Sequence, residues 1–179
     1  MNRTNFFNVI RKDLYRGKLE QKIVNAFTTV LNELDCFDLP IEYKAYMLAT
    51  AYHETAYTML PVKEAYWLSE GWRKNNLRYY PYYGRGFVQL TWKENYERAD
   101  RKLGLNGALT KNLDLALDPS IAMKVMVYGM LEGWFTNKKL SDYFDNGKKD
   151  YVGARKIING VDKKQEIAAH ARVFERALS

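Results

Sequence analysis

Apolar residues recur at every third or fourth position along most of this chain, which is the spacing of amphipathic helices. Asp118 followed by Pro119 marks the start of one such helix, and Gly104 marks the end of another. The helical pattern covers residues 6–14, 19–34, 41–55, 93–104, 118–135, 151–158 and 162–178. The chain is therefore expected to fold mainly as α-helices.

One short segment departs from the helical spacing. Residues 87–92, FVQLTW, alternate between apolar and polar side chains, which is the period of a β-strand. In a strand, the Gln89 amide and the Thr91 hydroxyl would face outward together and could hold a water molecule or a substrate amide. Thr91 has a second interpretation, because Thr91 and Glu94 fit a capping box at the start of the next helix.

Residues 59–83 follow neither period and are rich in tyrosine and tryptophan. A connection of this length in a compact domain is usually functional or disordered, and its aromatic content argues against disorder. A tight turn, GRG at residues 84–86, leads from it into the predicted strand. We expect a single domain, residues 1–179, in which this loop lies at a cleft between two helical lobes.

Composition limits the classes of partner and cofactor. The net charge of +7 and the pI near 9.3 suit an anionic partner such as nucleic acid, a membrane surface or an acidic wall polymer, although such a charge also serves solubility alone. The lone cysteine excludes an intrachain disulfide, and with two histidines it nearly excludes a tetrahedral zinc site. No metal and no cofactor are expected. No apolar run is long enough to span a bilayer, and the N-terminus lacks the order of a secretory signal.

Glu54 is the first candidate for chemistry. It points away from the apolar stripe of Leu48 and Tyr52, yet its own helix face carries Met47 and Thr50 rather than charged residues. Glu54 is therefore expected on a face that another part of the protein covers. A carboxyl group in partly apolar surroundings can hold its proton near neutral pH and act as an acid. The plainer interpretation is a surface glutamate near a helix end.

The aromatic loop contributes two further carboxylates, Glu64 and Glu70. Paired carboxylates between aromatic platforms are what glycoside hydrolysis requires: one acid protonates the leaving oxygen, and the second carboxylate activates water or attacks the sugar. A non-catalytic module that binds glycans or nucleic acid through the same aromatics is the rival interpretation. The carboxylates argue against nucleic acid, because they would repel phosphates.

Three motifs follow one another along the chain: AYHET at residues 51–55, YYGRGFVQLTWKENY at 82–96 and ARKIING at 154–160. Together they resemble glycoside hydrolase family 19, the chitinase-like enzymes. Residues 61–92 are most similar to the phage and prophage endolysins of that family, and the resemblance covers residues 39–178. It implies a mainly α, bilobal, lysozyme-like fold with a small β element, in one catalytic domain without a separate wall-binding module.

The resemblance also implies roles for residues within these motifs. Glu54 matches the general acid of the family, and Glu64 fits the general base in its compact bacterial members. Gln89, Thr91 and Asn95 match residues that hold the nucleophilic water and the N-acetyl group of the sugar. The family more often has serine where Thr91 stands.

Further residues are expected to bind substrate. Asn159 and Arg172 match late cleft residues that contact the substrate and support the base. Tyr83 and Arg85 match the segment that shapes the cleft floor, and His53 belongs to the His-Glu-Thr motif.

The function implied is that of a phage-type endolysin, which hydrolyses β-1,4 bonds of bacterial peptidoglycan by an inverting, two-carboxylate mechanism and lyses the host cell. The alternatives are a chitinase acting on N-acetylglucosamine polymers and a non-catalytic glycan-binding relative. We expect a monomer that binds glycan strands, does not bind nucleic acid and does not insert stably into a membrane. It would be made in the bacterial cytoplasm and reach the wall in the periplasm through a holin, or be delivered within a virion.

Overall fold

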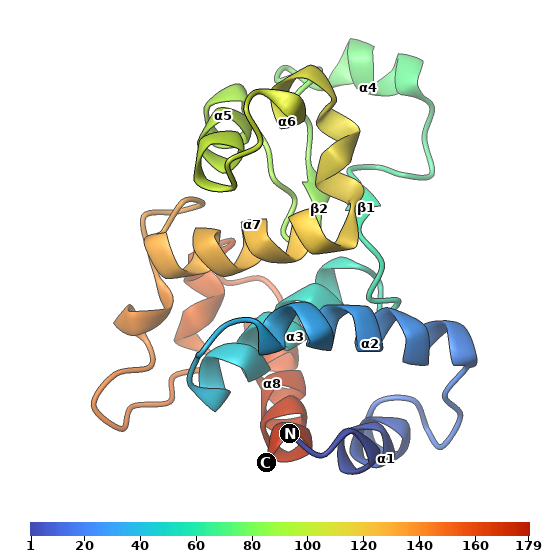
Figure 1. The fold of residues 1–179 in the computed structure, drawn as a ribbon, viewed down its shortest axis with the longest axis vertical. Helices are drawn as coiled ribbons and strands as arrows, with labels where there is room; N and C mark the ends of the chain where they lie inside the picture. The colour runs from blue at the N-terminus through green and yellow to red at the C-terminus, as the bar shows by residue number, and fades with distance from the viewer.

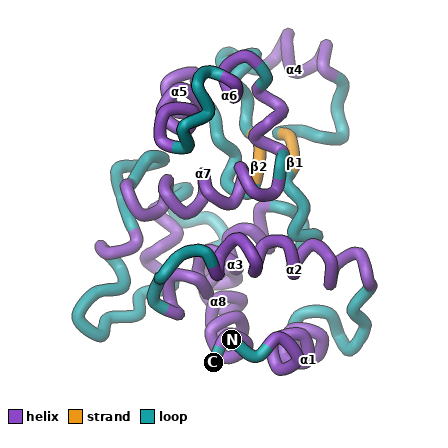
Figure 2. The backbone as a smooth tube through the Cα atoms, viewed as in Figure 1, coloured by secondary structure: helices purple, strands orange, loops and turns teal.

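The computed structural model describes all 179 residues, and most of them are helical (Figures 1 and 2). The helices are α1 (Arg3–Asp13), α2 (Gln21–Asp35), α3 (Ile41–Glu54), α4 (Glu70–Asn76), α5 (Lys93–Lys102), α6 (Ala108–Lys111), α7 (Pro119–Glu132) and α8 (Lys164–Leu178). Three short 3₁₀ segments are η1 (Leu113–Leu117), η2 (Leu140–Asp142) and η3 (Gly153–Ile157). The expectation of a mainly α fold with a small β element is confirmed.

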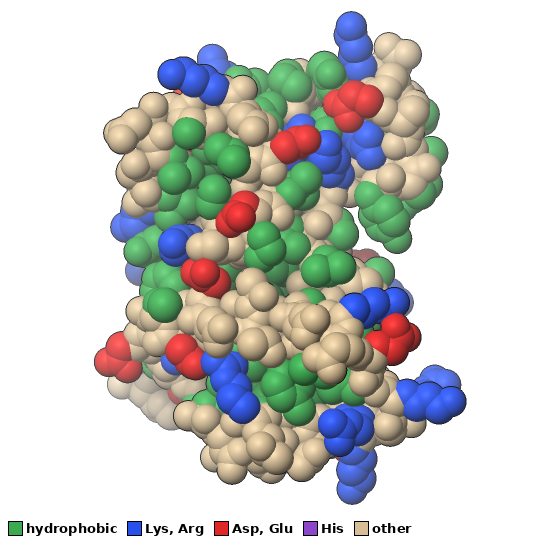
Figure 3. All heavy atoms as spheres, turned by 45° about the vertical axis from the view of Figure 1, so that its right-hand side comes forward, with side chains coloured by type: hydrophobic (Ala, Val, Ile, Leu, Met, Phe, Trp, Pro, Cys, Tyr) green, Lys and Arg blue, Asp and Glu red, His purple; other side chains and the backbone are tan.

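The elements form two groups, as Figure 1 shows. Helices α1, α2, α3 and α8 make up the lower lobe, and α3 packs most extensively against α8. The upper lobe holds α4, α5, α6 and the two strands, and α7 runs between the lobes, contacting α2 below and β2 above. The molecule is indented at one edge between its upper and lower parts (Figure 3).

Helix α3 is the centre of the core because it is covered on every side. All residues from Ala45 to Tyr52 are buried, including Met47 and Thr50, which share a face with Glu54. The expectation that another part of the protein covers this face is therefore confirmed. A buried helix of this kind fixes the position of the residues in its last turn, and Glu54 is the last residue of α3.

An aromatic cluster joins the helices of the lower lobe. The Phe174 ring of α8 lies 6.2 Å from Phe6 of α1, 5.8 Å from Phe27 of α2 and 5.7 Å from Tyr52 of α3. Removal of a buried ring such as Phe174 costs about 3–5 kcal/mol of stability. The cluster therefore holds α3, and with it the cleft residue at its end, in a fixed place.

The β element is smaller than predicted, and it lies elsewhere. Strands β1 (Val62–Lys63) and β2 (Arg85–Gly86) pair antiparallel, with Val62 opposite Gly86. The predicted strand over residues 87–92 is wrong: residues 87–89 form a turn, closed by a bridge between Arg85 and Leu90. Gly86, at φ +91°, and Gln89, at φ +55°, reverse the chain there. This turn buries Val88 and Leu90, as the predicted strand would, but Trp92, which the strand would also bury, is 42% exposed.

The capping-box interpretation of Thr91 is also wrong. Helix α5 begins at Lys93, and its N-cap is Trp92, without a side-chain cap bond. The Thr91 hydroxyl instead donates a hydrogen bond of 2.8 Å to the carbonyl oxygen of Gln89. Thr91 is thus free of a helix-cap role.

Two other segments differ from the sequence prediction. The aromatic loop contains β1 and helix α4, which is capped by Ser69 accepting a hydrogen bond from the Trp72 amide. The helix predicted over 151–158 is the short 3₁₀ segment η3, and the last helix begins at Lys164 rather than at residue 162. No helix combines the length and apolar character needed to cross a membrane.

Candidate active site

The end of α3 opens into a cavity of about 270 Å³ that gathers residues from four parts of the chain. Five of the side chains predicted to act in the site line it, together with apolar residues and one exposed tryptophan. The lining consists of Glu54, Val88, Gln89, Thr91, Trp92, Asn95, Phe135, Ile158 and Asn159. A carboxylate, a hydroxyl and several amides therefore face one space.

A second hollow, of about 190 Å³, adjoins the first, because Glu54 and Gln89 line both. Its other walls come from β1 and the residues after it, with Glu64, Tyr66 and Trp67 among them. Glu54 and Glu64 thus face a common hollow from different lobes. Two carboxylates on one cleft are the minimum that glycoside hydrolysis needs.

Glu54 is held by a buried arginine. Arg155, in η3, is only 4% exposed in its side chain, and its Nη1 donates a 2.7 Å hydrogen bond to Glu54 Oε1. The Arg155 Nε donates at 3.0 Å to the carbonyl oxygen of Asp162, which fixes the guanidinium. The backbone N–H of Asn159 donates at 3.0 Å to the carbonyl oxygen of Arg155, so the turn that follows η3 places Asn159 in the cavity wall near the arginine that holds Glu54.

Arg155 is the residue that the sequence interpretation missed. It lies within the ARKIING motif, in which Asn159 alone was predicted to contact substrate. The available signal was the spacing of Arg155 and Asn159, four residues apart, which places both on one side of a helical turn. Nothing in the sequence pattern pairs Arg155 with Glu54, because they lie 101 positions apart.

Glu64 is fixed at the edge of the hollow by two donors. The Tyr79 hydroxyl donates to Glu64 Oε1 at 2.6 Å, and the Gly84 amide donates to Oε2 at 2.9 Å. Burial, followed by the hydrogen bond to the Glu64 carboxylate, raises the pKa of Tyr79 to about 12. Tyr79 therefore keeps its proton at neutral pH and remains a donor to Glu64.

Glu70 has a different setting. It stands in the first turn of α4, about half exposed, and it accepts hydrogen bonds from Arg73 and from the Tyr83 hydroxyl. Glu70 lines neither the cavity at Glu54 nor the adjoining hollow. Of the two loop carboxylates, only Glu64 shares a space with Glu54.

The polar residues of the 89–95 segment hold one another in place. The Gln89 side chain donates to the Val62 carbonyl at 3.3 Å, and the Asn95 side chain donates to the Thr91 carbonyl at 3.0 Å. Gly84 leaves room for Gln89, because a Cβ at that position would lie 2.5 Å from Gln89 Oε1. The turn and the start of α5 therefore present Gln89, Thr91 and Asn95 to the cavity.

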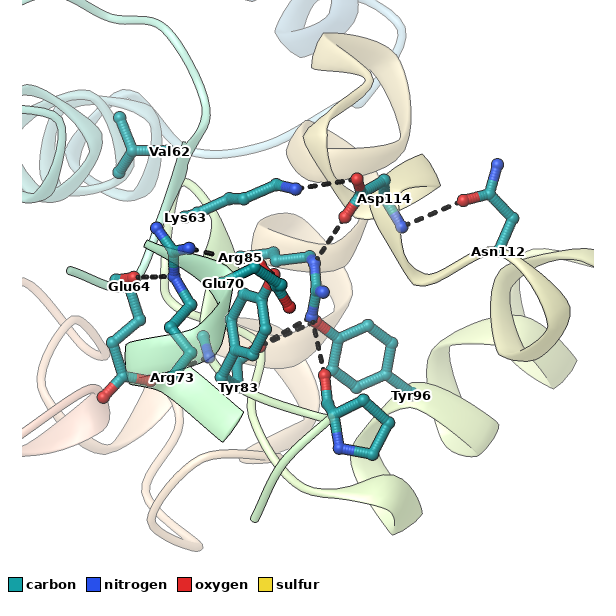
Figure 4. A network of polar contacts seen from close by, with 12 residues as sticks. Val62, Lys63, Glu64, Glu70, Arg73, Tyr83, Arg85, Tyr96, Asn112 and Asp114 are labelled. Atoms are coloured by element: carbon teal, nitrogen blue, oxygen red, sulfur yellow. Dashed lines mark hydrogen bonds and ion pairs between the residues drawn. The ribbon is translucent and has the colours of Figure 1, made fainter. Parts of the chain in front are cut away.

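Tyr83 and Arg85 do not reach the cleft. They belong to an interior network beneath it (Figure 4), in which Arg85, 4% exposed, pairs with Asp114 at 2.9 Å and donates to the Tyr96 hydroxyl at 3.0 Å. The Arg85 guanidinium also lies 3.7 Å from the centre of the Tyr83 ring. Burial raises the pKa of Tyr83 to about 12. Neither residue lines the cavities, and their visible role is to brace β2 against η1.

His53 and Arg172 also lie apart from these cavities. The His53 Nδ1 is 3.7 Å from Glu166 on α8, and it lines neither hollow. Arg172 is exposed on α8 and makes no contact with Glu54 or Glu64 through its side chain. The charge that the sequence interpretation placed near the carboxylates through Arg172 is supplied by Arg155 instead.

Large aromatic side chains stand exposed around the two hollows. Trp92 is 42% exposed at the first, and Tyr66 and Trp67 are 59% and 72% exposed at the second. Exposed rings beside hydrogen-bonding side chains are suited to the flat faces and hydroxyl groups of sugars. No three of the histidine, cysteine, aspartate and glutamate side chains lie together as a metal site would require.

Comparison with known proteins gives a short but strong match. Over 48 residues the chain is 48% identical to the acidic 26 kDa endochitinase of Solanum lycopersicum, and 46% identical to the acidic endochitinase pcht28 of Solanum chilense. Each match covers 26% of this chain and 19% of the relative, so the chain spans about a fifth of the curated relatives it matches. No protein-family model matches the chain.

Among solved structures, chitinase C from Streptomyces griseus aligns with 94% of this chain and 76% of its own, at 18% identity and a TM-score of 0.49. A mutant of chitinase C aligns with 96% of this chain and 92% of its own, at 17% identity and the same TM-score. The chain is related in sequence to chitinases over the matched segment.

Proposed function

We propose that this chain is a glycoside hydrolase that cleaves the β-1,4 bonds of bacterial peptidoglycan, with Glu54 as general acid and Glu64 as general base. The observation that carries the proposal is the common hollow lined by both carboxylates, beside a cavity of amides and a hydroxyl. The sequence match to endochitinases supports the same reaction class, since those relatives act on a glycan.

Glu54 is suited to give up a proton to a leaving group. Donation to the glycosidic oxygen leaves a Glu54 carboxylate, and the Arg155 guanidinium at 2.7 Å already stands where it can compensate that negative charge. In the acid form Glu54 carries the proton on Oε2 while Oε1 accepts the hydrogen bond from Arg155. The contact becomes an ion pair once the proton has left, and it therefore stabilises the state that follows proton transfer. General acid catalysis of this kind contributes typically 10²–10⁴-fold to a rate.

Glu64 takes the proton of the attacking water. Its carboxylate is held by Tyr79 and the Gly84 amide, which leaves remaining lone pairs for the water. Thr91 commits its only proton to the Gln89 carbonyl, so its hydroxyl oxygen is left to accept a hydrogen bond from that water. A water held between carboxylates in this way leads to inversion, which requires roughly 6.5–9.5 Å between the carboxyl groups.

The walls of the cleft suit an N-acetylated sugar chain. Trp92, Tyr66 and Trp67 offer ring faces, and Asn95 and Asn159 offer amides for the N-acetyl group. The net charge of +7 favours association with a wall whose peptides and attached polymers are negative. In this role the enzyme acts as an endolysin, made in the bacterial cytoplasm and released to the wall through a holin or delivered in a virion.

A chitinase is the second candidate, and the 48-residue match to two endochitinases favours it. In that case the same carboxylates would act on N-acetylglucosamine polymers. The two candidates differ in substrate and share the roles of Glu54 and Glu64.

The experiment that separates them compares two substrates. Purified protein is added to outer-membrane-permeabilised bacterial cells and, separately, to colloidal chitin; turbidity and released reducing ends are followed. We expect clearing of the cells, and mass spectrometry of the fragments then identifies the bond that is cut. Clearing of chitin alone would assign a chitinase, and binding to either polymer without release of reducing ends would assign a non-catalytic relative.

The base is tested by separate alanine substitutions. We expect Glu64→Ala to lose activity and Glu70→Ala to retain it, because Glu70 lines neither hollow. An inactive Glu70→Ala beside an active Glu64→Ala would reverse the assignment.

A further inference from the structure

We infer that a third cavity of the cleft, at the far end from Glu64, binds a carboxylate on a substituent that the glycan carries. The cavity measures about 470 Å³, and its walls come from the segment after α7 and from the end of η3. It is lined by Thr136, Lys138, Lys156, Ile158, Asn159, Gly160 and Val161. The inference rests on the proposed function, because it assumes that a glycan occupies the cavity at Glu54.

The position of this cavity, here called the lysine cavity, makes it part of the cleft. Ile158 and Asn159 line both the lysine cavity and the cavity that contains Glu54. A polymer bound at Glu54 therefore continues past Asn159, and a substituent on its next sugars reaches the lysine cavity. The lysine cavity is thus placed to bind a substituent of the glycan and does not contact the bond that is cut.

The charge of the lysine cavity is one-sided. Lys138 and Lys156 line it, both are exposed, and neither forms an ion pair with a carboxylate of the chain. No aspartate or glutamate lines the cavity, whereas Glu54 lines both other hollows of the cleft and Glu64 lines one of them. Two unpaired ammonium groups beside a concave surface favour an anion.

Two carbonyl oxygens that would repel an anion are occupied by a local hydrogen-bond donor. The Thr136 hydroxyl lies near the carbonyl oxygens of Lys156 and Ile157, and it donates to this pair, with 3.0 Å to the Ile157 oxygen. These are carbonyls at the end of η3, where negative partial charge would otherwise face the cavity. The two lysines are then the dominant charges there.

The shape suits a short chain with apolar parts. A Cβ at Gly160 would meet no atom within 4 Å, so the space above it is open, and Val161 beside it is 59% exposed. A carboxylate on a small aliphatic chain can place its methyl groups on Val161 and its charge at the lysines. The peptide stem of peptidoglycan has this chemistry, and an unsubstituted N-acetylglucosamine polymer does not.

The test uses the Glu54→Gln protein, so that bound glycan is not cut. Calorimetric titration measures its affinity for soluble peptidoglycan strands that retain their peptides, for the same strands after conversion of the carboxylates to amides, and for a neutral N-acetylglucosamine hexamer. We expect the carboxylate strands to bind about tenfold more tightly than the amidated strands, which is ~1.4 kcal/mol. Adding Lys138→Gln and Lys156→Gln together should abolish that difference.

Two controls isolate the cavity. Lys138→Arg with Lys156→Arg keeps the charges and should keep the preference. Lys12→Gln with Lys18→Gln removes the same two charges from exposed positions in and just after α1, which line none of these cavities, and should change nothing. High salt should weaken the preference for carboxylate strands, because exposed charges are screened.

The outcomes separate the inference from the function beneath it. If the double glutamine variant loses affinity equally for all three ligands, or for none, the inference is overturned while the hydrolase proposal stands. Binding of the hexamer without a preference for carboxylates also overturns the inference and favours a chitinase. If no ligand binds, the proposed function fails and the inference fails with it.

Discussion

Arg155→Met tests the ion pair that holds Glu54. The substitution keeps most of the side-chain volume and removes the guanidinium, which is 4% exposed and donates to Glu54 at 2.7 Å and to Asp162 at 3.0 Å. Removing one partner of a buried ion pair costs about 3–5 kcal/mol. Glu54 is 19% exposed and lines a cavity, so water recovers part of that cost, and we expect a loss of about 1–3 kcal/mol.

The loss is measured by thermal and urea unfolding followed by circular dichroism. For a chain of this size each kcal/mol lowers Tm by about 2–4 °C, so a loss near 2 kcal/mol corresponds to roughly 4–8 °C. A matched control is Arg176→Met, whose side chain is 59% exposed and pairs with Asp13 at 2.9 Å on the surface. That pair should contribute about 0–1 kcal/mol.

A double-mutant cycle assigns the effect to the pair itself. Arg155→Met, Glu54→Gln and their combination should show a coupling energy of at least ~1 kcal/mol, because each change removes one charge of the same ion pair. The reasoning is refuted if Arg155→Met is no more destabilising than Arg176→Met, or if the two changes are additive.

The other predictions concern the turn, a histidine and metal dependence. Gly84→Ala should displace Gln89 and lower kcat by about ten- to a hundredfold. The control is Gly71→Ala, whose added Cβ would meet only a serine oxygen, at 3.8 Å, and which should keep the wild-type kcat. An equal loss of kcat in both variants would contradict the role of Gly84 in placing Gln89. Burial lowers the pKa of His170 below 6.5. The unfolded chain therefore binds this proton more readily, so stability is full above about pH 6.5 and falls as the pH drops below it. His170→Gln should therefore reduce the fall of Tm with decreasing pH over that acidic range. A Tm that falls with pH as steeply as in the wild type would contradict this role of His170. EDTA should leave the rate unchanged, and activity lost to EDTA and restored by a divalent ion would require other chemistry.

Helices whose apolar faces meet the core could be predicted from sequence. The pattern in α2 and α3 gives their positions to within a residue or two, and Asp118 with Pro119 marks the start of α7. The buried face around Glu54 was predicted for the same reason, because Met47 and Thr50 are not residues of a solvent face. These features are recorded in local spacing, which the sequence displays directly.

Features that depend on the tertiary fold could not be predicted. The turn at residues 87–89 imitates a strand, because a reversal at Gly86 and Gln89 buries Val88 and Leu90 as a strand would. Helix α4 is short and carries no apolar stripe, so its seven residues passed as loop. The spacing of apolar residues predicts which side chains are buried, and it does not predict the backbone conformation that buries them.

The candidate site also combines features that the sequence shows with features that depend on the fold. One cavity is lined by five residues of the sequence motifs: Glu54, Gln89, Thr91, Asn95 and Asn159. The pairing of Arg155 with Glu54 and the burial of Arg85 against Asp114 could not be predicted, because each depends on a contact between distant parts of the chain.

The most direct measurement of the central claim is proton NMR of glycan cleavage by the wild type and by Glu54→Gln. A soluble glycan strand or N-acetylglucosamine oligomer is followed during the first minutes of digestion. The account predicts that the wild type releases the α-anomer from the β-linked chain and that Glu54→Gln, with its fold intact by circular dichroism, retains less than a tenth of the rate. Comparable hydrolysis by Glu54→Gln, or a β-anomer or an anhydro-sugar end at early times, would contradict it.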